Sequence, residues 1–143
     1  MAGRIATMRL PVQKGQKHVK AKIRQESVRH LAFIRGLPCV LTGRTDGVQA
    51  HHLLRCPDSE ERGGAMKAGD RWTIPIVRRM HDALHASGDE IAFLGAHSVY
   101  GPAVAALLWS LSSNQEQAER AIGHVLDLVR LHAVTEPLCR ING

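Results

Sequence analysis

The chain has 143 residues, which is enough for one compact domain with its own core and too few for two. Its hydrophobic fraction of 44% is ordinary for a globular protein, its apolar runs are all shorter than a membrane span, and its three cysteines fit no disulfide framework. We therefore expect a cytoplasmic protein without a membrane partner, and the net charge of +6 favours nucleic acid as the partner instead.

The basic charge is concentrated at the start of the chain, where the first 25 residues hold seven basic side chains and no acidic one. Such a segment extends by self-repulsion and binds polyanions, so we predict a flexible basic arm over residues 1–18 that contacts DNA. A tail that only keeps the protein in solution is the alternative. The candidate DNA-binding residues in this part of the chain are Lys17, Lys20 and Lys22.

The next elements are a helix and two short strands. Apolar residues at helical spacing predict a helix within residues 19–36, and Gly36 and Pro38 end it. Two β-prone runs follow, at 39–43 and 48–54. The Asp-Gly pair between the two runs is a strong local signal for a hairpin, so we expect these runs to pair with each other.

A polar, glycine-rich loop leads to the short extended piece "WTIPI", whose Pro75 suits the first turn of a following helix. That helix is predicted over residues 76–87 and ends at Gly88, because glycine readily takes the left-handed conformation after a helix. Further helices are predicted within 88–101, 102–111 and 115–134. The fold class is therefore α+β, with a small β-hairpin and a helix embedded in a mainly helical single domain. Its regions are the arm 1–18, the N-terminal helix 19–36, the core 37–97 and the C-terminal helical packing region 98–143.

Two histidine pairs stand out: His51 and His52 on a predicted strand, and His81 and His85 one turn apart on a helix. Each pair alone has an ordinary explanation, either a buried imidazole bonded to backbone or a solvated helix face. The order hairpin, loop, helix lets the imidazoles converge, and three converging neutral imidazoles typically bind a divalent metal ion. Neighbouring strand residues point to opposite faces, so we expect His51 and His52 at a strand end or irregularity.

Residues 37–97, including "GLPCVLTGR", "VQAHHLLR" and "MHDALHASGDEIAFLGAH", resemble the HNH, or ββα-metal, nuclease superfamily. More narrowly, "HH…AMKAGDRWTIPIVRRMHDALHASG" is similar to the phrase "HH…GxKxxDxWxxPLCxxHHxxLHxxG" of the phage-type recombination-enhancement nucleases, which act with bacterial recombinase filaments. The resemblance implies a ββα-metal fold for this region. It also implies hydrolysis of DNA phosphodiester bonds with one metal ion.

The same resemblance implies a role for each histidine. His51 matches the first metal ligand, His52 the general base that takes a proton from the attacking water, and His81 and His85 the helix residues that complete the metal site. The implied cofactor is one divalent ion, which would be Mg, Mn or Zn. A cation at the scissile phosphate stabilises the developing charge, and an imidazole with a pKa near neutral suits the base.

Three arginines near these histidines are candidates for contact with the substrate. Arg55 directly follows the strand that carries the histidine pair, so it could stabilise the transition-state phosphate. Arg78 and Arg79 open the predicted helix and are the best candidates there for DNA contact. Nearby acidic residues almost balance the basic ones, so a mixed, solvated surface stays the alternative.

The chain departs from the family at the structural zinc that many relatives hold on two pairs of ligands. The corresponding positions read Cys39-x-x-Thr42 and Val77-x-x-Met80. We therefore predict no structural zinc, with Cys39 as a small buried apolar residue. Cys56 could in principle complete a site with Cys39, but it lies in the predicted loop.

A second departure concerns the asparagine for which the middle letter of HNH stands. In the superfamily this asparagine braces the metal-binding loop by hydrogen bonds. Trp72 stands at that position here, so the role would fall to Asp70 or to the backbone.

The preferred hypothesis is a metal-dependent DNA endonuclease that acts in phage or prophage recombination, with a bacterial recombinase filament as a candidate partner. One alternative is a DNA-binding or recombination accessory module that keeps the fold without cleavage. Another is a small structural-zinc interaction domain, in which a cysteine joins His51, His81 and His85.

Overall fold

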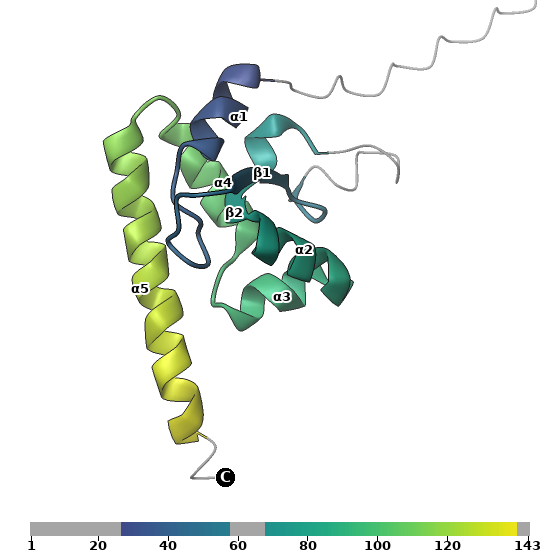
Figure 1. The fold of residues 1–143 in the computed structure, drawn as a ribbon, viewed down its shortest axis with the longest axis vertical. Helices are drawn as coiled ribbons and strands as arrows, with labels where there is room; N and C mark the ends of the chain where they lie inside the picture. Colours follow the sequence, from purple (N-terminus) through teal and green to yellow (C-terminus); the bar gives the residue numbers. More distant parts are fainter. Residues whose placement is uncertain (1–26, 58–67, 140–143) are drawn as a thin grey trace, which may run out of the picture.

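The computed structural model describes residues 27–57 and 68–139 (Figure 1). The predictions for the basic arm 1–18, and for Lys17, Lys20 and Lys22 within or just after it, lie outside the described residues. The elements, in chain order, are α1 (Val28–Arg35), β1 (Val48–His52), the short 3₁₀ helix η2 (Asp70–Trp72), β2 (Thr73–Val77), α2 (Arg78–Ser87), α3 (Glu90–Ala96), α4 (Gly101–Ser110) and α5 (Gln115–Cys139). The predicted fold class is confirmed: a two-stranded antiparallel hairpin lies within a mainly helical α+β domain.

The first helix begins later than predicted. Ser27 is the N-cap of α1: its backbone is extended and its side chain accepts a hydrogen bond from the backbone N–H of His30. The predicted helix 19–36 was therefore wrong at its start, and residues 19–26 lie outside the described residues. Its end was right, since the backbone N–H of Gly36 closes the last turn of α1.

The predicted pairing of residues 39–43 with 48–54 was wrong. Residues 39–44 form a closed loop instead, in which the backbone N–H of Cys39 donates to the oxygen of Arg44 and that of Gly43 donates to the oxygen of Cys39. Strand β1 pairs with β2, and the register places His51 opposite Ile74 and His52 opposite Thr73. The Asp-Gly signal does mark a turn, because Gly47 has a φ of +68°, but the turn leads into β1 without a preceding partner strand.

Pro75 lies inside β2 rather than in the first turn of a helix, so that prediction was also wrong. It stands opposite Ala50 at a position where its carbonyl points away from β1 and accepts a hydrogen bond from the backbone N–H of Val40. The missing N–H of proline therefore removes no bond from the β1–β2 ladder. The helix starts at Arg78 and ends at Gly88, whose left-handed φ of 71° confirms the predicted end.

The core lies between the hairpin and the helices packed on it. Ile74 and Ile76 of β2 are fully buried, and they pack with Leu84 of α2 and Leu108 of α4 in one apolar cluster. Figure 1 shows α2 and α3 side by side on one flank of the hairpin and the long α5 on the other. The predicted helical character of residues 98–143 is confirmed for the part that α4 and α5 cover. This arrangement fixes the end of β1 against α2 and α3.

Within the described ranges, no single helix is long and apolar enough to cross a membrane. The pair α3 and α4 meets the requirement by length and composition only, and the two helices are bent by 81° at their junction.

Candidate metal centre

Three imidazoles meet where the end of β1 packs against α2. His51 comes from β1, whereas His81 and His85 come from successive turns of α2, and one ligand nitrogen of each lies within 4.8 Å of the others. The Nε2 atoms of His81 and His85 are 3.3 Å apart. The predicted convergence of a strand histidine with two helix histidines is therefore present in the structure.

The orientation of His51 is set by Glu90, the first residue of α3. The Nε2 atom of His51 lies 2.7 Å from Glu90 Oε1, and both side chains are buried. The same carboxylate accepts hydrogen bonds from the backbone N–H groups of Leu54 and Arg55, at 2.9 and 3.0 Å from Oε2. When His51 donates through Nε2, its Nδ1 carries the lone pair and becomes the ligand nitrogen of the cluster.

The surroundings of His81 favour its neutral form. Burial lowers the pKa of His81, and the neighbouring rings of His51 and His85 lower it further, against a weaker opposing effect of Asp82. Burial alone would raise the pKa of Glu90, but its hydrogen bonds with His51 and with the backbone N–H groups of Arg55 and Leu54 lower it overall. An ionised carboxylate next to a neutral imidazole is the usual arrangement behind a histidine metal ligand.

The spacing of the rings fits a metal ion. Two nitrogens bound to one tetrahedral zinc ion at about 2.0–2.1 Å lie roughly 3.3–3.4 Å apart. His81 and His85 already have this separation. Among the described residues the group has three members, and three protein ligands are enough to hold a divalent ion.

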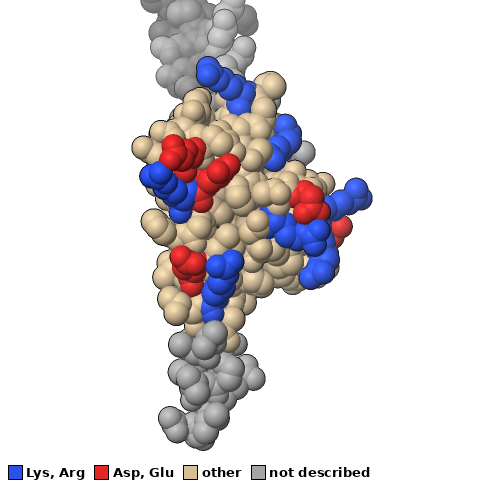
Figure 2. Space-filling model, turned by 60° about the vertical axis from the view of Figure 1, so that its left-hand side comes forward, with Lys and Arg blue, Asp and Glu red and all other residues tan. Residues whose placement is uncertain are grey.

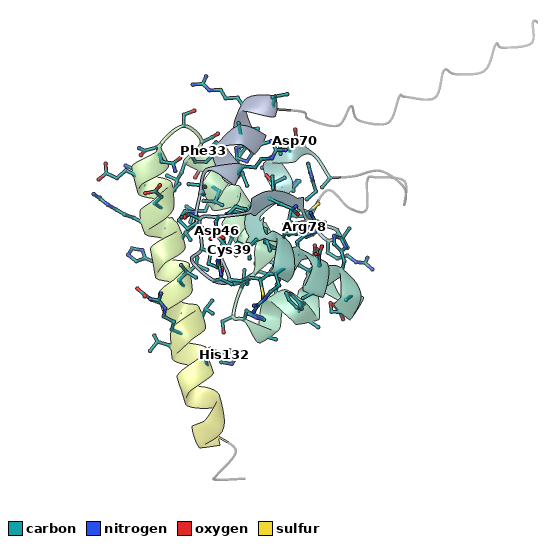
Figure 3. The ribbon with its side chains drawn as sticks, in the orientation of Figure 1. Phe33, Cys39, Asp46, Asp70, Arg78 and His132 are labelled. Carbon is teal, nitrogen blue, oxygen red and sulfur yellow. The ribbon has the colours of Figure 1, made fainter. Side chains whose placement is uncertain are left out.

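His52 is held separately from the other three histidines. Its Nε2 lies 2.7 Å from Asp70 Oδ1, and its side chain is 22% exposed while that of Asp70 is buried. The other oxygen of Asp70 accepts the backbone N–H of Ser27 at 2.7 Å, beside the start of α1 (Figure 3). Asp70, which the sequence named as a candidate brace of the metal-binding loop, is hydrogen-bonded to His52 and to the backbone of Ser27.

The three arginines chosen from the sequence are exposed. The backbone of Arg55 is tied to Glu90, so Arg55 stands immediately beside the cluster. Arg78 is the first residue of α2, one turn before His81, and its side chain lies 3.8 Å from Asp82. Because Asp82 partly neutralises it, Arg78 offers less free charge to a phosphate than Arg79, the next residue of the same turn.

The described ranges carry nine basic and nine acidic residues, so the entire net charge of +6 comes from residues outside them. On the face shown in Figure 2, basic and acidic side chains lie next to one another, separated by wide uncharged areas. Arg120 pairs with Glu116, and Arg130 with Asp127, both along α5. Among the residues for which the sequence kept a mixed, solvated surface as the alternative, Arg44 pairs with Asp46 and Arg78 lies 3.8 Å from Asp82.

The cysteines do not join the metal cluster in the described part of the chain. Cys39 is fully buried in the apolar core, as predicted, and lies among the packed elements in Figure 3. Cys56 is also buried. The ligand group in the described residues consists of histidines alone.

Sequence reasoning missed Glu90. Asp89 is the N-cap of α3 and accepts the backbone N–H of Ala92, so an acidic pair at this place looks like ordinary helix capping. The signal that could have found Glu90 is the combination of a buried histidine on β1 and an acidic residue opening the next helix after the histidine helix. Only the fold brings these two elements together.

Comparison with known proteins gives one match. No curated protein and no solved structure matches the chain. The sequence profile of a family described as "Protein of unknown function (DUF968)" matches residues 12–108, which include the three clustered histidines, His52, Asp70 and Glu90. Because this match covers more than half of the sequence, the chain belongs to the DUF968 family.

Proposed function

We propose that this protein is a metal-dependent DNA endonuclease that hydrolyses phosphodiester bonds in the manner of the HNH nucleases. The observation that carries the proposal is the cluster of His51, His81 and His85, whose ligand nitrogens lie within 4.8 Å of one another at the end of a β-hairpin. A neighbouring histidine, His52, is held by a buried carboxylate. When bound at the cluster, a divalent ion would stabilise the charge that develops on the scissile phosphate and on the leaving oxygen.

The proposed base is His52. In the proposed mechanism Nε2–H of His52 donates a hydrogen bond to Asp70, so that Nδ1 has the lone pair and takes a proton from the attacking water. The water oxygen forms a bond to phosphorus while the bond between phosphorus and the leaving oxygen of the DNA breaks. Asp70 stabilises the imidazolium that results.

Two other groups support the reaction. Glu90 holds His51 with its Nδ1 available for a metal ion, and the same carboxylate fixes the backbone of Arg55 beside the cluster. Arg55 then contributes positive charge next to the phosphate. Lys17, Lys20 and Lys22, with Arg78 and Arg79, supply affinity for the DNA backbone that does not depend on sequence.

The proposed biological setting comes from the resemblance of residues 51–52 and 65–88 to recombination-enhancement nucleases. In that setting the protein works in the cytoplasm during phage or prophage recombination, with a recombinase filament as its partner. Mg, Mn and Zn are the candidate ions, because oxygen-rich phosphate and imidazole ligands accept each of them.

The test is nicking of a supercoiled plasmid by the full-length chain, treated with EDTA and then supplied with magnesium, manganese or zinc. We expect nicking only with metal. His52→Ala should retain metal binding and lower the rate about 10²–10⁴-fold, the usual contribution of a positioned base. His81→Ala should weaken metal binding. His124→Ala, at an exposed histidine of α5, is the matched control and should change neither quantity.

Three results would contradict the proposal. Nicking by purified His52→Ala protein at the wild-type rate excludes His52 as the base. Metal binding without nicking, in the presence and absence of a recombinase filament, favours the non-cleaving accessory module. A chain that unfolds on metal removal favours the structural-zinc domain, because structural sites contribute directly to folding.

A further inference from the structure

A cavity of about 290 Å³ lies directly beside the candidate metal centre. It opens between the segment that follows β1 and the start of α4, and α3 forms its third wall. Glu90 and Arg55 line this cavity, and Glu90 also bonds to His51 of the cluster. The cavity and the cluster therefore share a wall.

The walls are largely apolar and the rim carries exposed apolar side chains. Leu53, Leu94 and Val99 are buried around the cavity. At the rim, Ile91 is 62% exposed and Tyr100, the only tyrosine of the chain, is 69% exposed. Large apolar side chains that stay this exposed around a hollow indicate that something covers them.

The floor of the cavity is tightly built. Gly101 begins α4 there, and a Cβ atom at this position would lie 2.8 Å from Leu53 Cδ2 and 3.1 Å from Leu94 Cδ1. The absence of a side chain at Gly101 thus lets α4 approach the wall closely. A cavity with a packed floor and an open, aromatic rim is shaped for a flat group that enters from the rim.

We propose that this cavity binds one nucleobase of the DNA strand whose phosphate lies at the histidine cluster; the inference rests on the proposed function and extends it to the substrate. The volume is near the lower end of ligand sites, roughly 300–1,000 Å³, and therefore suits one small flat group. Tyr100 offers an aromatic face for stacking. Arg55 at the mouth matches the phosphate that accompanies every base.

The charge of Glu90 does not oppose such a ligand strongly. Both of its oxygens accept hydrogen bonds, from His51 and from two backbone N–H groups, so its negative charge is compensated within the protein. A base in a duplex would first have to leave its stack, at a cost of a few kcal/mol. The site therefore favours single-stranded or unpaired DNA.

The test compares two fluorescent strands of about 12 nucleotides, within the usual site size of single-strand binding. One strand is abasic throughout, and the other carries a single base at its centre. Binding is followed by anisotropy with the full-length His52→Ala protein and manganese, so that the strand is not consumed. The additional variants are Tyr100→Ala, Tyr100→Phe and, as an exposed apolar control on α5, Leu128→Ala.

We expect the single base to tighten binding about 5- to 150-fold, the range measured for one stacked base. Tyr100→Phe and Leu128→Ala should keep this gain, and Tyr100→Ala should lose it. Because Tyr100 is exposed, its truncation leaves the core intact, which thermal unfolding of the same samples checks.

Each of the other possible outcomes contradicts the proposed binding of a nucleobase in the cavity. If both strands bind equally well, or if the gain survives in Tyr100→Ala, the cavity does not hold the base, while the proposed nuclease stands. The cavity would then be open to another occupant, such as an apolar side chain of a protein partner. If neither strand binds at all, this inference fails, and the plasmid-nicking assay decides separately whether the proposed function stands.

Discussion

Replacing Glu90 with glutamine tests whether this carboxylate sets the proton position on His51. Oε1 faces His51 Nε2 and lies 3.1 Å from the backbone N of Leu54, whereas Oε2 accepts the backbone N–H groups of Leu54 and Arg55 at the shorter distances of 2.9 and 3.0 Å. A glutamine satisfies these two donors only when its carbonyl oxygen takes the Oε2 position, so its NH₂ group must face His51. The amide then donates to Nε2, and the proton of the neutral imidazole moves to Nδ1, the nitrogen that would bind the metal.

The expected effect on metal binding is larger than the effect on folding. Loss of a partner that orients a histidine ligand typically weakens metal affinity about 10- to 100-fold. The glutamine keeps the two backbone bonds and exchanges one charged acceptor, so the free energy of unfolding should fall by about 1–2 kcal/mol. The variant should therefore fold and yet bind metal poorly.

Calorimetric titration of manganese or zinc into EDTA-treated protein measures this directly. Unfolding in urea gives a second readout: at a metal concentration 100 times the wild-type Kd, the wild type gains about 2.7 kcal/mol, but a variant with 100-fold weaker affinity gains only about 0.4 kcal/mol. Glu116→Gln, at an exposed glutamate of α5, is the matched control. A folded Glu90→Gln protein with an unchanged Kd would refute the tautomer argument.

Three further predictions follow from other contacts. Asp70→Asn should leave metal affinity unchanged but lower nicking about as much as His52→Ala, because the amide must again place its NH₂ group against an imidazole; a loss of metal binding in this variant would contradict the assignment. Burial lowers the pKa of His30 below its ordinary value of 6.5, although Asp70 partly opposes this. As the pH falls, His30 therefore binds a proton in the unfolded chain before it does so in the folded protein. Stability should then fall as the pH drops below about 6.5, by at most about 1.4 kcal/mol per pH unit, and His30→Gln should flatten this slope in urea unfolding at a series of pH values. For double-stranded DNA, the slope of log affinity against log salt should become less steep by about 0.9 for each lysine that contacts a phosphate, measured by anisotropy for the combined alanine variant of Lys17, Lys20 and Lys22.

The sequence predicted the order of elements and the convergence of histidines better than it predicted strand pairing. His81 and His85 had to share a helix face because of their spacing, and the helix had to end at Gly88. The hairpin was misassigned because the Asp-Gly turn is a local signal, whereas the true partner of β1 lies about twenty residues away along the chain and is selected by burial. Every residue of β2 is buried. The residues next to β2 in the sequence do not reveal this, because its burial depends on elements that are distant along the chain.

The cavity and the role of Glu90 could not be predicted from the sequence. Both depend on how α3 and α4 pack against the segment after β1, and the helices looked like packing material with no chemistry of their own. Tyr100 in particular is unremarkable in the sequence. It gains significance only because the start of α4 brings it to the rim of a hollow beside the cluster.

The two adjacent histidines are explained by two carboxylates on different elements. His51 and His52 lie at the end of β1, and a different carboxylate bonds to each ring. Glu90 comes from α3 and holds His51, while Asp70 comes from η2 and holds His52. Glu90 bonds through Oε1 to His51 and through Oε2 to the backbone N–H of Arg55. Asp70 bonds through Oδ1 to His52 and through Oδ2 to the backbone N–H of Ser27, so neither carboxylate can turn away without breaking a bond to the main chain. A neutral imidazole that donates from Nε2 to such a carboxylate keeps the lone pair on Nδ1. That tautomer is the one that the proposed function requires, for metal binding at His51 and for proton acceptance at His52.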